Sequence, residues 1–298
     1  MPTNDQKNVL PTRPVQTFVA ESTTGRPNVR PTRPRRPERA LVFSRADGEL
    51  WDFLDVVGVA TINQISRYLG RSESTLRRRL PKHRRLGITN SRSVGNGSHT
   101  QVWWLTKQGS IAGIGRRHMT GMSTPALPSL AHALALTEVF IHLSAEVGSG
   151  RLVHERAIIA SDLHGNTKVA TDYAGRRGRV LLKRPRFVFP TESLEGTGDY
   201  QIGAIHLPDL LLRTDPSPDG WSRFEMHECE VTSKSNKRVT DLLRAAASER
   251  FAPHISGITY WVCSDAVEHQ IVRSAKTAHV EVTVRRFAHP VPDLLWRP

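Results

Sequence analysis

The sequence predicts an α+β protein, with a small helical module and a β-hairpin followed by a larger domain of alternating strands and helices. Three observations support this prediction. Apolar residues at helical spacing, each run preceded by a capping residue, extend from about residue 45 to residue 86. Residues 95–98 (Gly-Asn-Gly-Ser) form a hairpin-turn signal. From about residue 129 onward, strand-like and helix-like segments follow the order α-β-β-β-α-β.

At about 150 residues per domain, a chain of 298 residues predicts about two folded domains. We expect an arm over residues 1–40, the helical module over 41–118, a linker over 119–128 and the α/β domain over 129–298. The arm holds seven prolines and eight Lys or Arg against three acids, which predicts a disordered basic segment. It is interpreted either as a solubilising tail or as an arm that follows DNA phosphates or a minor groove. The second role would use Arg30, Arg33, Arg35, Arg36 and Arg39.

Composition favours a polyanionic partner inside the cell. The formal net charge is +14, which suits nucleic acid better than it suits a small-metabolite enzyme. Only Cys229 and Cys263 are present, which excludes a disulfide scaffold and indicates a reducing compartment. We expect no membrane span and no secretory signal, because no stretch of about 18 uncharged apolar residues and no apolar leader is visible. The predicted location is the cytoplasm.

The helical module is predicted from its caps and its apolar spacing. Ser44 precedes a first helix whose apolar side is Leu50, Phe53, Leu54 and Val57. Thr61 caps a second helix that ends at Gly70, and Ser72 opens a third. A strand after residue 88, the hairpin turn and a returning strand over 101–105 follow, and Thr106 caps a further short helix. Three helices followed by a hairpin are typical of a winged helix-turn-helix.

Two tryptophans stand next to each other on the returning strand. Adjacent strand residues point to opposite faces, so one of Trp103 and Trp104 is expected in the core and the other at the surface. We prefer core packing to a base-stacking role for this pair.

The third helix is the predicted DNA-reading element. With Leu76, Leu80 and His83 toward the core, its opposite side carries cations and short hydroxyl side chains. From residue 71 to residue 92 there are eight Lys or Arg and one acid. The predicted DNA contacts on the helix are Ser72, Ser74, Thr75, Arg77, Arg78, Lys82, Arg84 and Arg85, and those on the wing are Arg92, Asn96, Ser98 and His99. Pro81 predicts a kink or a break within this helix. A solvated charged face and a protein-contact role are the alternatives.

The second domain is predicted to start with a long apolar helix over 129–147. Strands are expected at 151–159, 204–213, 224–232, 257–263 and 280–287, with helices at 236–250 and 266–275. A Gly- and Arg-rich excursion over 161–201 interrupts this order. Its basic residues are interpreted as contacts to the DNA backbone.

Four charged residues of this domain resemble a metal-dependent nuclease site. Pro208-Asp209 precedes an apolar strand, and Glu228 and Glu230 share one face of a later strand. This layout is that of the PD-(D/E)xK nuclease fold, in which carboxylates hold Mg²⁺ and a lysine assists the attacking water. The expected lysine two positions after the acid is missing, because Thr232 stands there. Lys234, four positions after Glu230, is the candidate replacement. A nuclease-like fold without cleavage, an active enzyme and an unrelated α/β arrangement all stay open.

The chain also resembles a known family. The resemblance is carried by Trp104-Leu105-Thr106-Lys107-Gln108-Gly109, by Leu130-Ala131-His132, by Pro208-Asp209, and by Trp221 followed by residues 224–235. This order is similar to the replication-relaxation proteins of plasmids and other mobile elements, over roughly residues 45–275. The arm and the basic excursion lie outside the shared pattern. The resemblance implies a DNA-binding accessory protein that acts beside a relaxase or a replication protein.

These observations lead to one main hypothesis and two alternatives. The main hypothesis is a double-stranded-DNA-binding accessory protein of plasmid or mobile-element replication, relaxation or mobilisation. In it, no cofactor is needed, and the α/β domain mediates homodimer formation or partner contact. The first alternative is a nuclease or nickase with Asp209, Glu228, Glu230 and Lys234 as catalytic residues and Asp209 and Glu230 as Mg²⁺ ligands. The second alternative is a transcriptional repressor of a phage or plasmid.

Overall fold

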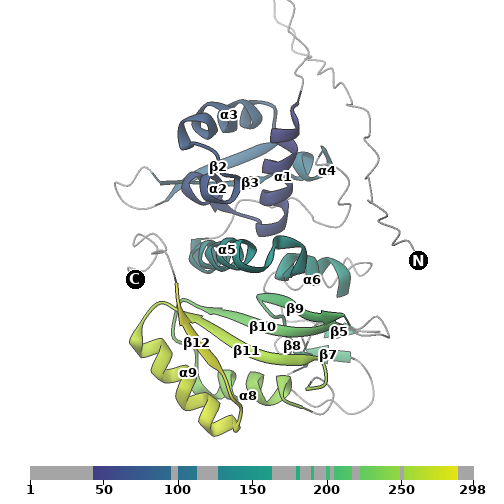
Figure 1. Cartoon of the computed structure of the whole chain (residues 1–298), viewed down its shortest axis with the longest axis vertical. Coiled ribbons are helices and arrows are strands. Elements are labelled where there is room, and N and C mark those ends of the chain that lie inside the picture. Colours follow the sequence, from purple (N-terminus) through teal and green to yellow (C-terminus); the bar gives the residue numbers. More distant parts are fainter. Residues whose placement is uncertain are drawn as a thin grey trace, which may run out of the picture. The chain divides into compact units, whose positions relative to one another are not determined.

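The computed structural model is a mixed α and β protein, as the sequence predicts (Figure 1). The structure describes residues 43–94, 100–112, 127–162, 179–181, 189–190, 199–201, 205–216, 222–248 and 252–287. The chain divides into two compact units, residues 1–49 and 50–298. The predicted arm (1–40), the wing tip (95–99), residues 119–126 of the predicted linker and most of the basic excursion (161–201) lie outside the described residues.

Of the first unit, residues 43–49 are described, and they contain the start of helix α1 (Arg45–Val57). Ser44 precedes this helix, as predicted. Its backbone N–H and its hydroxyl both donate to Oδ2 of Asp47, at 2.8 and 2.9 Å. The carbonyl of Ser44 accepts from the backbone N–H of Asp47 at 2.8 Å. The helix therefore begins where its capping residue indicates.

Helices α2 (Ile62–Leu69) and α3 (Glu73–Arg85) follow the predicted boundaries closely. Thr61 and Gln64 form a capping box: the Thr61 hydroxyl accepts from the Gln64 N–H, and the Gln64 side chain accepts from the Thr61 N–H. Gly70 ends α2 in the left-handed region, with φ of 62°. Ser72 then caps α3 by accepting from the Thr75 N–H. The connection between the two helices is therefore fixed by local chemistry.

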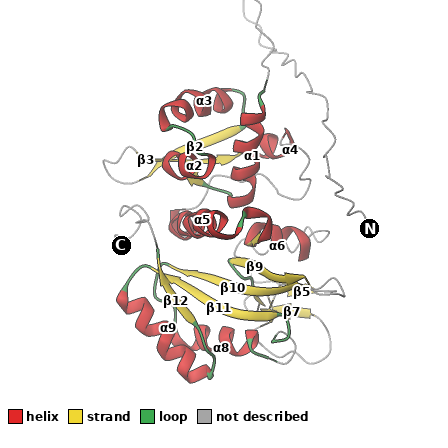
Figure 2. Ribbon diagram, viewed as in Figure 1, coloured by secondary structure: helices red, strands yellow, loops and turns green. Residues whose placement is uncertain are grey.

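A small antiparallel sheet accompanies these helices, in the order β1 (Ala60–Thr61), β3 (Thr100–Leu105) and β2 (Thr89–Val94). Figure 2 shows this sheet beside α2 and α3. Strand β3 is central, and α2 and α4 (Lys107–Ala112) both contact it. The prediction that one of Trp103 and Trp104 lies at the surface is wrong, because each is 2% exposed. The sequence pattern does not predict the two-residue strand β1, which pairs with β3 on the edge opposite β2.

The second sheet is five-stranded and mixed, in the order β12-β11-β10-β9-β4. Its strands are β4 (Leu152–His154), β9 (Leu210–Pro216), β10 (Ser222–Glu230), β11 (Ile255–Val262) and β12 (Thr283–Arg286). Strands β4, β9 and β10 pair antiparallel, whereas β10, β11 and β12 run parallel. Helices α8 (Asn236–Ala246) and α9 (Asp265–Ala278) make the two parallel crossovers.

Helices cover both faces of this sheet, with α8 and α9 on one face and α5 (Leu127–Val147) on the other (Figure 1). The core under α8 and α9 includes Met226, Leu243, Tyr260 and Ile271. Although no membrane span was expected, residues Ser129–Val147 of α5 are long and apolar enough to cross a membrane by length and composition alone. This segment is mostly buried inside the structure and contacts β4, β10 and α2, as a core helix does.

Three predicted strands are shorter than expected, and the one at 280–287 is reduced to β12. Residues 151–159 contain the last residue of the 3₁₀ turn η1 (Ser149–Arg151), all of strand β4 and the start of helix α6 (Glu155–Asp162). The predicted strand at 204–213 is divided into β8 (Ile205–His206) and β9, because Pro208 lacks a backbone donor and interrupts the pairing. The short strands β5 (Arg179–Leu181) and β7 (Asp199–Gln201) pair with each other, and β6 (Phe189–Pro190) pairs with β8.

Candidate functional site

Helix α3 is anchored by one apolar side. Leu76, Leu80 and His83 are buried, as the helical wheel predicts. The ring nitrogen Nδ1 of His83 accepts a hydrogen bond from Nε1 of Trp51 at 3.3 Å. The helix runs without interruption through Pro81, so the break that Pro81 allowed is absent. These contacts fix which side of α3 faces outward.

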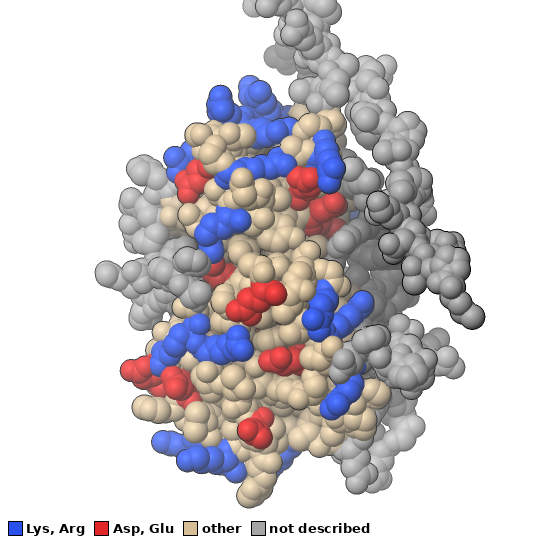
Figure 3. All heavy atoms as spheres, in the orientation of Figure 1, with Lys and Arg blue, Asp and Glu red and all other residues tan. Residues whose placement is uncertain are grey.

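The outward side of α3 is rich in positive charge. Its exposed residues include Ser72, Ser74, Arg77, Arg78, Lys82, Arg84 and Arg85, while Thr75 is half-buried. In Figure 3 the Lys and Arg side chains gather over α3, at the top of the view. Arg77 pairs with Glu73 at 2.7 Å, and Arg84 donates to the hydroxyl of Ser91 in β2 at 3.2 Å. Arg78, Lys82 and Arg85 have no ion-pair partner among the residues that the structure describes.

The predicted wing contacts are only partly described. Arg92 is exposed on β2. Asn96, Ser98 and His99 belong to the turn between β2 and β3, which lies outside the described residues. The two strands on either side of this segment are paired. Thr89 stands opposite Leu105 at one end of the pairing, and Val94 stands opposite Thr100 at the other.

The four predicted catalytic residues lie around the start of β9 and the end of β10. Asp209 directly precedes β9, Glu228 and Glu230 occupy β10, and Lys234 follows β10 before α8. The three carboxylates are all buried. The ammonium of Lys234 forms an ion pair with Glu230. Lys234, which stands four positions after Glu230 in the sequence, therefore reaches the carboxylate of Glu230.

Asp209 is held from two sides. Its Oδ2 accepts from the backbone N–H of Cys229 at 2.8 Å, and its Oδ1 lies 3.1 Å from Nε2 of His132 in α5. Its backbone carbonyl accepts from the N–H of Glu155 at 2.9 Å, which brings the start of α6 beside it. Asp209 thus joins β9, β10, α5 and α6.

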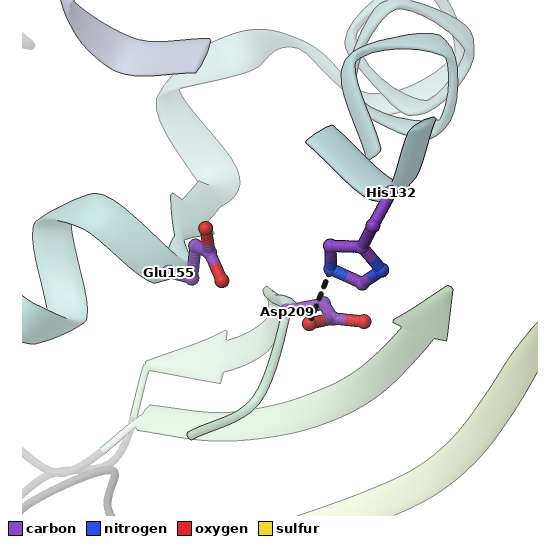
Figure 4. Close-up of side chains that lie close together, drawn as sticks. All are labelled: His132, Glu155 and Asp209. Atoms are coloured by element: carbon purple, nitrogen blue, oxygen red, sulfur yellow. Dashed lines mark hydrogen bonds and ion pairs between the residues drawn. The ribbon is translucent and has the colours of Figure 1, made fainter. Parts of the chain in front are cut away.

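His132, Glu155 and Asp209 place one potential ligand atom each within 4.8 Å of one another (Figure 4). Asp209 is buried, whereas His132 and Glu155 are partly exposed. Glu228 and Glu230 are not members of this group. Among the described residues, the ligand atoms that gather around Asp209 are therefore those of His132 and Glu155. Glu230, the predicted second metal ligand, does not belong to this group.

Burial and mutual charge shift several pKa values. The charge of Asp209 raises the pKa of His132 to about 9, against the effect of burial. Burial pushes the pKa of Asp209 upward, but His132 and Lys234 outweigh it and hold this pKa at about 2. Burial and the neighbouring Asp209 raise the pKa of Glu155 to about 7. Burial raises the pKa of Glu230 to about 7 as well, although Lys234 opposes the shift. The site carries more acidic than basic groups.

Glu228 is the most deeply buried of these carboxylates, at 1% exposure. Its Oε1 lies 2.9 Å from Nε2 of His206, while its Oε2 is buried without a hydrogen-bond partner in the described structure. Burial raises the pKa of Glu228. Tyr260 of β11 stands opposite Glu228 of β10 in the sheet. Its hydroxyl is also buried and has no hydrogen-bond partner in the described structure. These are the atoms of the site that lack a hydrogen-bond partner.

His132, Glu155 and Tyr260 also belong to this region of the structure, and the sequence pattern does not predict them as site residues. His132 carries a signal in the sequence, because a histidine interrupts an otherwise apolar stretch of helix. Glu155 was assigned to a strand, whereas it begins α6. Tyr260 gave no signal, because an aromatic residue within an apolar strand is typical of a core.

In a comparison with protein families, the model of the replication-relaxation family matches residues 52–177. The resemblance predicted from the sequence is confirmed over this range. The matched range is narrower than the predicted 45–275 and includes residues 161–177, which were expected to lie outside the shared pattern. Asp209, Glu228, Glu230 and Lys234 lie beyond it. No curated protein and no solved structure gives a significant match to the chain.

Proposed function

We propose that this chain, whose residues 52–177 match the replication-relaxation family, is a cytoplasmic double-stranded-DNA-binding accessory protein of a plasmid or other mobile element. It would act in replication, relaxation or mobilisation. The observation that carries the proposal is the outward side of α3, where Arg78, Lys82 and Arg85 have no ion-pair partner in the described part of the chain. A solvated helix face usually mixes both signs of charge, and this one is almost wholly positive.

The element order supports a winged helix-turn-helix interpretation. Helices α2 and α3 are joined by a short capped turn, and the hairpin β2–β3 follows α3 directly. In this motif the second helix of the pair enters the major groove. Ser72, Ser74 and Thr75 then lie at the N-terminal end, where short side chains reach base edges. Arg78, Lys82 and Arg85 lie further along and suit phosphates or guanine.

The α/β domain is proposed to contact a second protein. A homodimer partner and a relaxase or replication protein are the two candidates from the family resemblance. Sedimentation of the purified chain distinguishes self-association from a need for another protein.

The test of DNA binding compares two variants of matched charge loss. In one, Arg78 and Arg85, which are exposed on α3, are changed to Ala. In the other, Arg273 and Lys276, which are exposed on α9, are changed to Ala. Fluorescence anisotropy with a labelled duplex is measured over a range of salt concentrations. Each phosphate contact contributes about 0.9 to the slope of log affinity against log salt.

We expect the α3 variant to bind the duplex at least about tenfold more weakly and to lose about 2 from the magnitude of the salt slope. The α9 variant should match the wild type. Equal affinity and equal slope for the α3 variant would remove α3 from the DNA interface.

A second candidate function is a metal-dependent DNA nuclease, and the ion pair between Lys234 and Glu230 favours it. Asp209, Glu228 and Glu230 are carboxylates, which suit Mg²⁺, and Oε2 of Glu228 is buried without a hydrogen-bond partner in the described structure. Asp209 and Glu230 would hold the ion. A bound Mg²⁺ would neutralise charge on a phosphodiester. Lys234 would hold and orient a water molecule beside Glu230.

Supercoiled plasmid separates the two functions. A nuclease converts it to the nicked or linear form in the presence of Mg²⁺, and Asp209→Ala should abolish this conversion. Tight duplex binding by the wild type without nicking supports the accessory role alone. Nicking that persists in Asp209→Ala would indicate a contaminating enzyme.

A further inference from the structure

We propose that His132, Glu155 and Asp209 bind one divalent transition-metal cation, for which Mn²⁺ and Zn²⁺ are the best candidates. This centre shares only Asp209 with the nuclease-like set of residues. It does not depend on DNA binding by α3.

The geometry already brings the three ligand atoms together. They come from α5, from the first residue of α6 and from the residue before β9, and they lie within 4.8 Å of one another. Figure 4 shows His132 and Glu155 on either side of Asp209. Ligands about 2.1 Å from a shared ion lie about 3 to 4.2 Å apart, so a small closure of the side chains suffices.

The surroundings of Asp209 orient it as a ligand. The N–H of Cys229 fixes one carboxylate oxygen at 2.8 Å, which leaves the other toward His132. The backbone hydrogen bond from Glu155 to the Asp209 carbonyl, at 2.9 Å, holds the start of α6 in place. Outer hydrogen bonds of this kind fix ligands in metal sites.

The donor set selects the class of ion. One imidazole nitrogen and two carboxylate oxygens suit Mn²⁺ or Zn²⁺, whereas Mg²⁺ and Ca²⁺ prefer oxygen alone. Three protein ligands leave further positions of the ion open to water or to a phosphate oxygen. His132 and Glu155 are partly exposed, which gives the ion a route from solvent. When the ion binds, the proton on Nε2 of His132 leaves to solvent.

A second observation points to a missing positive charge. Glu228 is 1% exposed, and its Oε2 has no hydrogen-bond partner in the described structure. Glu228 interacts electrostatically with Glu155 and with Asp209. The carboxylates of Glu155, Asp209 and Glu228 repel one another, which leaves an excess of negative charge at the site. A divalent cation between Glu155 and Asp209 would neutralise this excess.

The test is equilibrium binding of Mn²⁺, in which electron paramagnetic resonance measures the concentration of the free ion. Binding of Zn²⁺ is measured in parallel by calorimetry. The protein is first treated with a chelator and dialysed. The wild type is expected to bind one Mn²⁺ or one Zn²⁺ per chain. His132→Gln and Glu155→Gln should each weaken binding at least about tenfold, since even outer-sphere changes cost this much.

Glu146→Gln is the matched control, because it removes an exposed carboxylate of α5, the helix that carries His132, and neither this centre nor the nuclease-like set uses it. It should bind the ion as the wild type does. Thermal unfolding without metal identifies any variant that fails to fold, and Glu155→Asp serves as a second probe of the same ligand.

Two outcomes would overturn the proposal. In the first, the wild type takes up neither ion. In the second, Glu230→Gln loses the ion and Glu155→Gln keeps it, which would assign the metal to the nuclease-like set. Duplex binding measured in chelator reports on α3 separately, so a failure here is distinguishable from a failure of the proposed function.

Discussion

Nε2 of His132 lies 3.1 Å from Oδ1 of Asp209, and this pair connects the apolar core helix α5 to the residue that precedes β9. The two residues are 77 positions apart in the sequence. Asp209 is 6% exposed, so the pair lies mostly out of water. The contact places a charged pair near the buried Glu228 of β10, with which Asp209 interacts electrostatically.

The His132–Asp209 pair predicts a pH-dependent stability. The groups that act on His132 are Asp209, Glu155 and Lys234, and the pKa of His132 is raised from 6.5 to about 9. A raised pKa means that the folded state binds the proton more tightly, so the contribution is complete below pH 6.5 and is lost as the pH rises through 9. Its size is up to about 3 kcal/mol, at 1.36 kcal/mol per pKa unit.

Urea unfolding of the wild type and of His132→Gln, in chelator, measures this contribution. The difference in unfolding free energy should be larger at pH 6 than at pH 9.5. A difference that stays constant over this range would show that the pair is not charged in the folded protein.

Gly109 should be intolerant of a side chain. A Cβ atom at this position would stand 2.0 Å from the carbonyl oxygen of Ile88, which is backbone and cannot move aside easily. We expect Gly109→Ala to lower the unfolding free energy by about 2 kcal/mol or more. Gly150→Ala is the control, since no atom lies within 4 Å of the added Cβ there. Similar melting temperatures for the two variants would contradict the packing of α4 against residue 88.

Glu138 of α5 should stabilise the contact between α5 and α2. Its Oε1 accepts from Nε2 of Gln64 at 2.9 Å and from the guanidinium of Arg67 at 2.5 Å. Glu138 is buried, so its removal leaves Arg67 without this partner. We expect Glu138→Ala to cost about 2 to 4 kcal/mol of unfolding free energy and Glu138→Gln to cost less. Denaturant titration measures both, and a loss below about 0.5 kcal/mol would refute the contact.

Much of the helical module could be predicted because its signals are local. Ser44, Thr61, Gly70 and Ser72 act within one turn of their own positions, and each stands at a helix end in the structure. The buried side of α3 followed from helical periodicity alone. The alternating order of the second domain was also visible, since its strands and helices differ in period.

The features that were missed depend on tertiary contacts. Trp104 is buried because β1 and two helices surround β3, and two residues of β1 give too short a signal to recognise. The sequence around Glu155 favours a strand because apolar Leu152 and Val153 precede it and apolar residues 157–159 follow it, yet Glu155 starts α6. The meeting of His132, Glu155 and Asp209 requires three distant segments to converge, which no local pattern records.

The most direct test of the central claim is site-specific photo-crosslinking to a duplex. A photo-crosslinking amino acid replaces exposed Ser74 at the N-terminal end of α3, and in a matched protein it replaces exposed Lys276 on α9. Irradiation with labelled double-stranded DNA should give a covalent adduct from position 74 and none above background from position 276. Adducts of equal yield from both positions, or an adduct from position 276 alone, would contradict a DNA interface on α3.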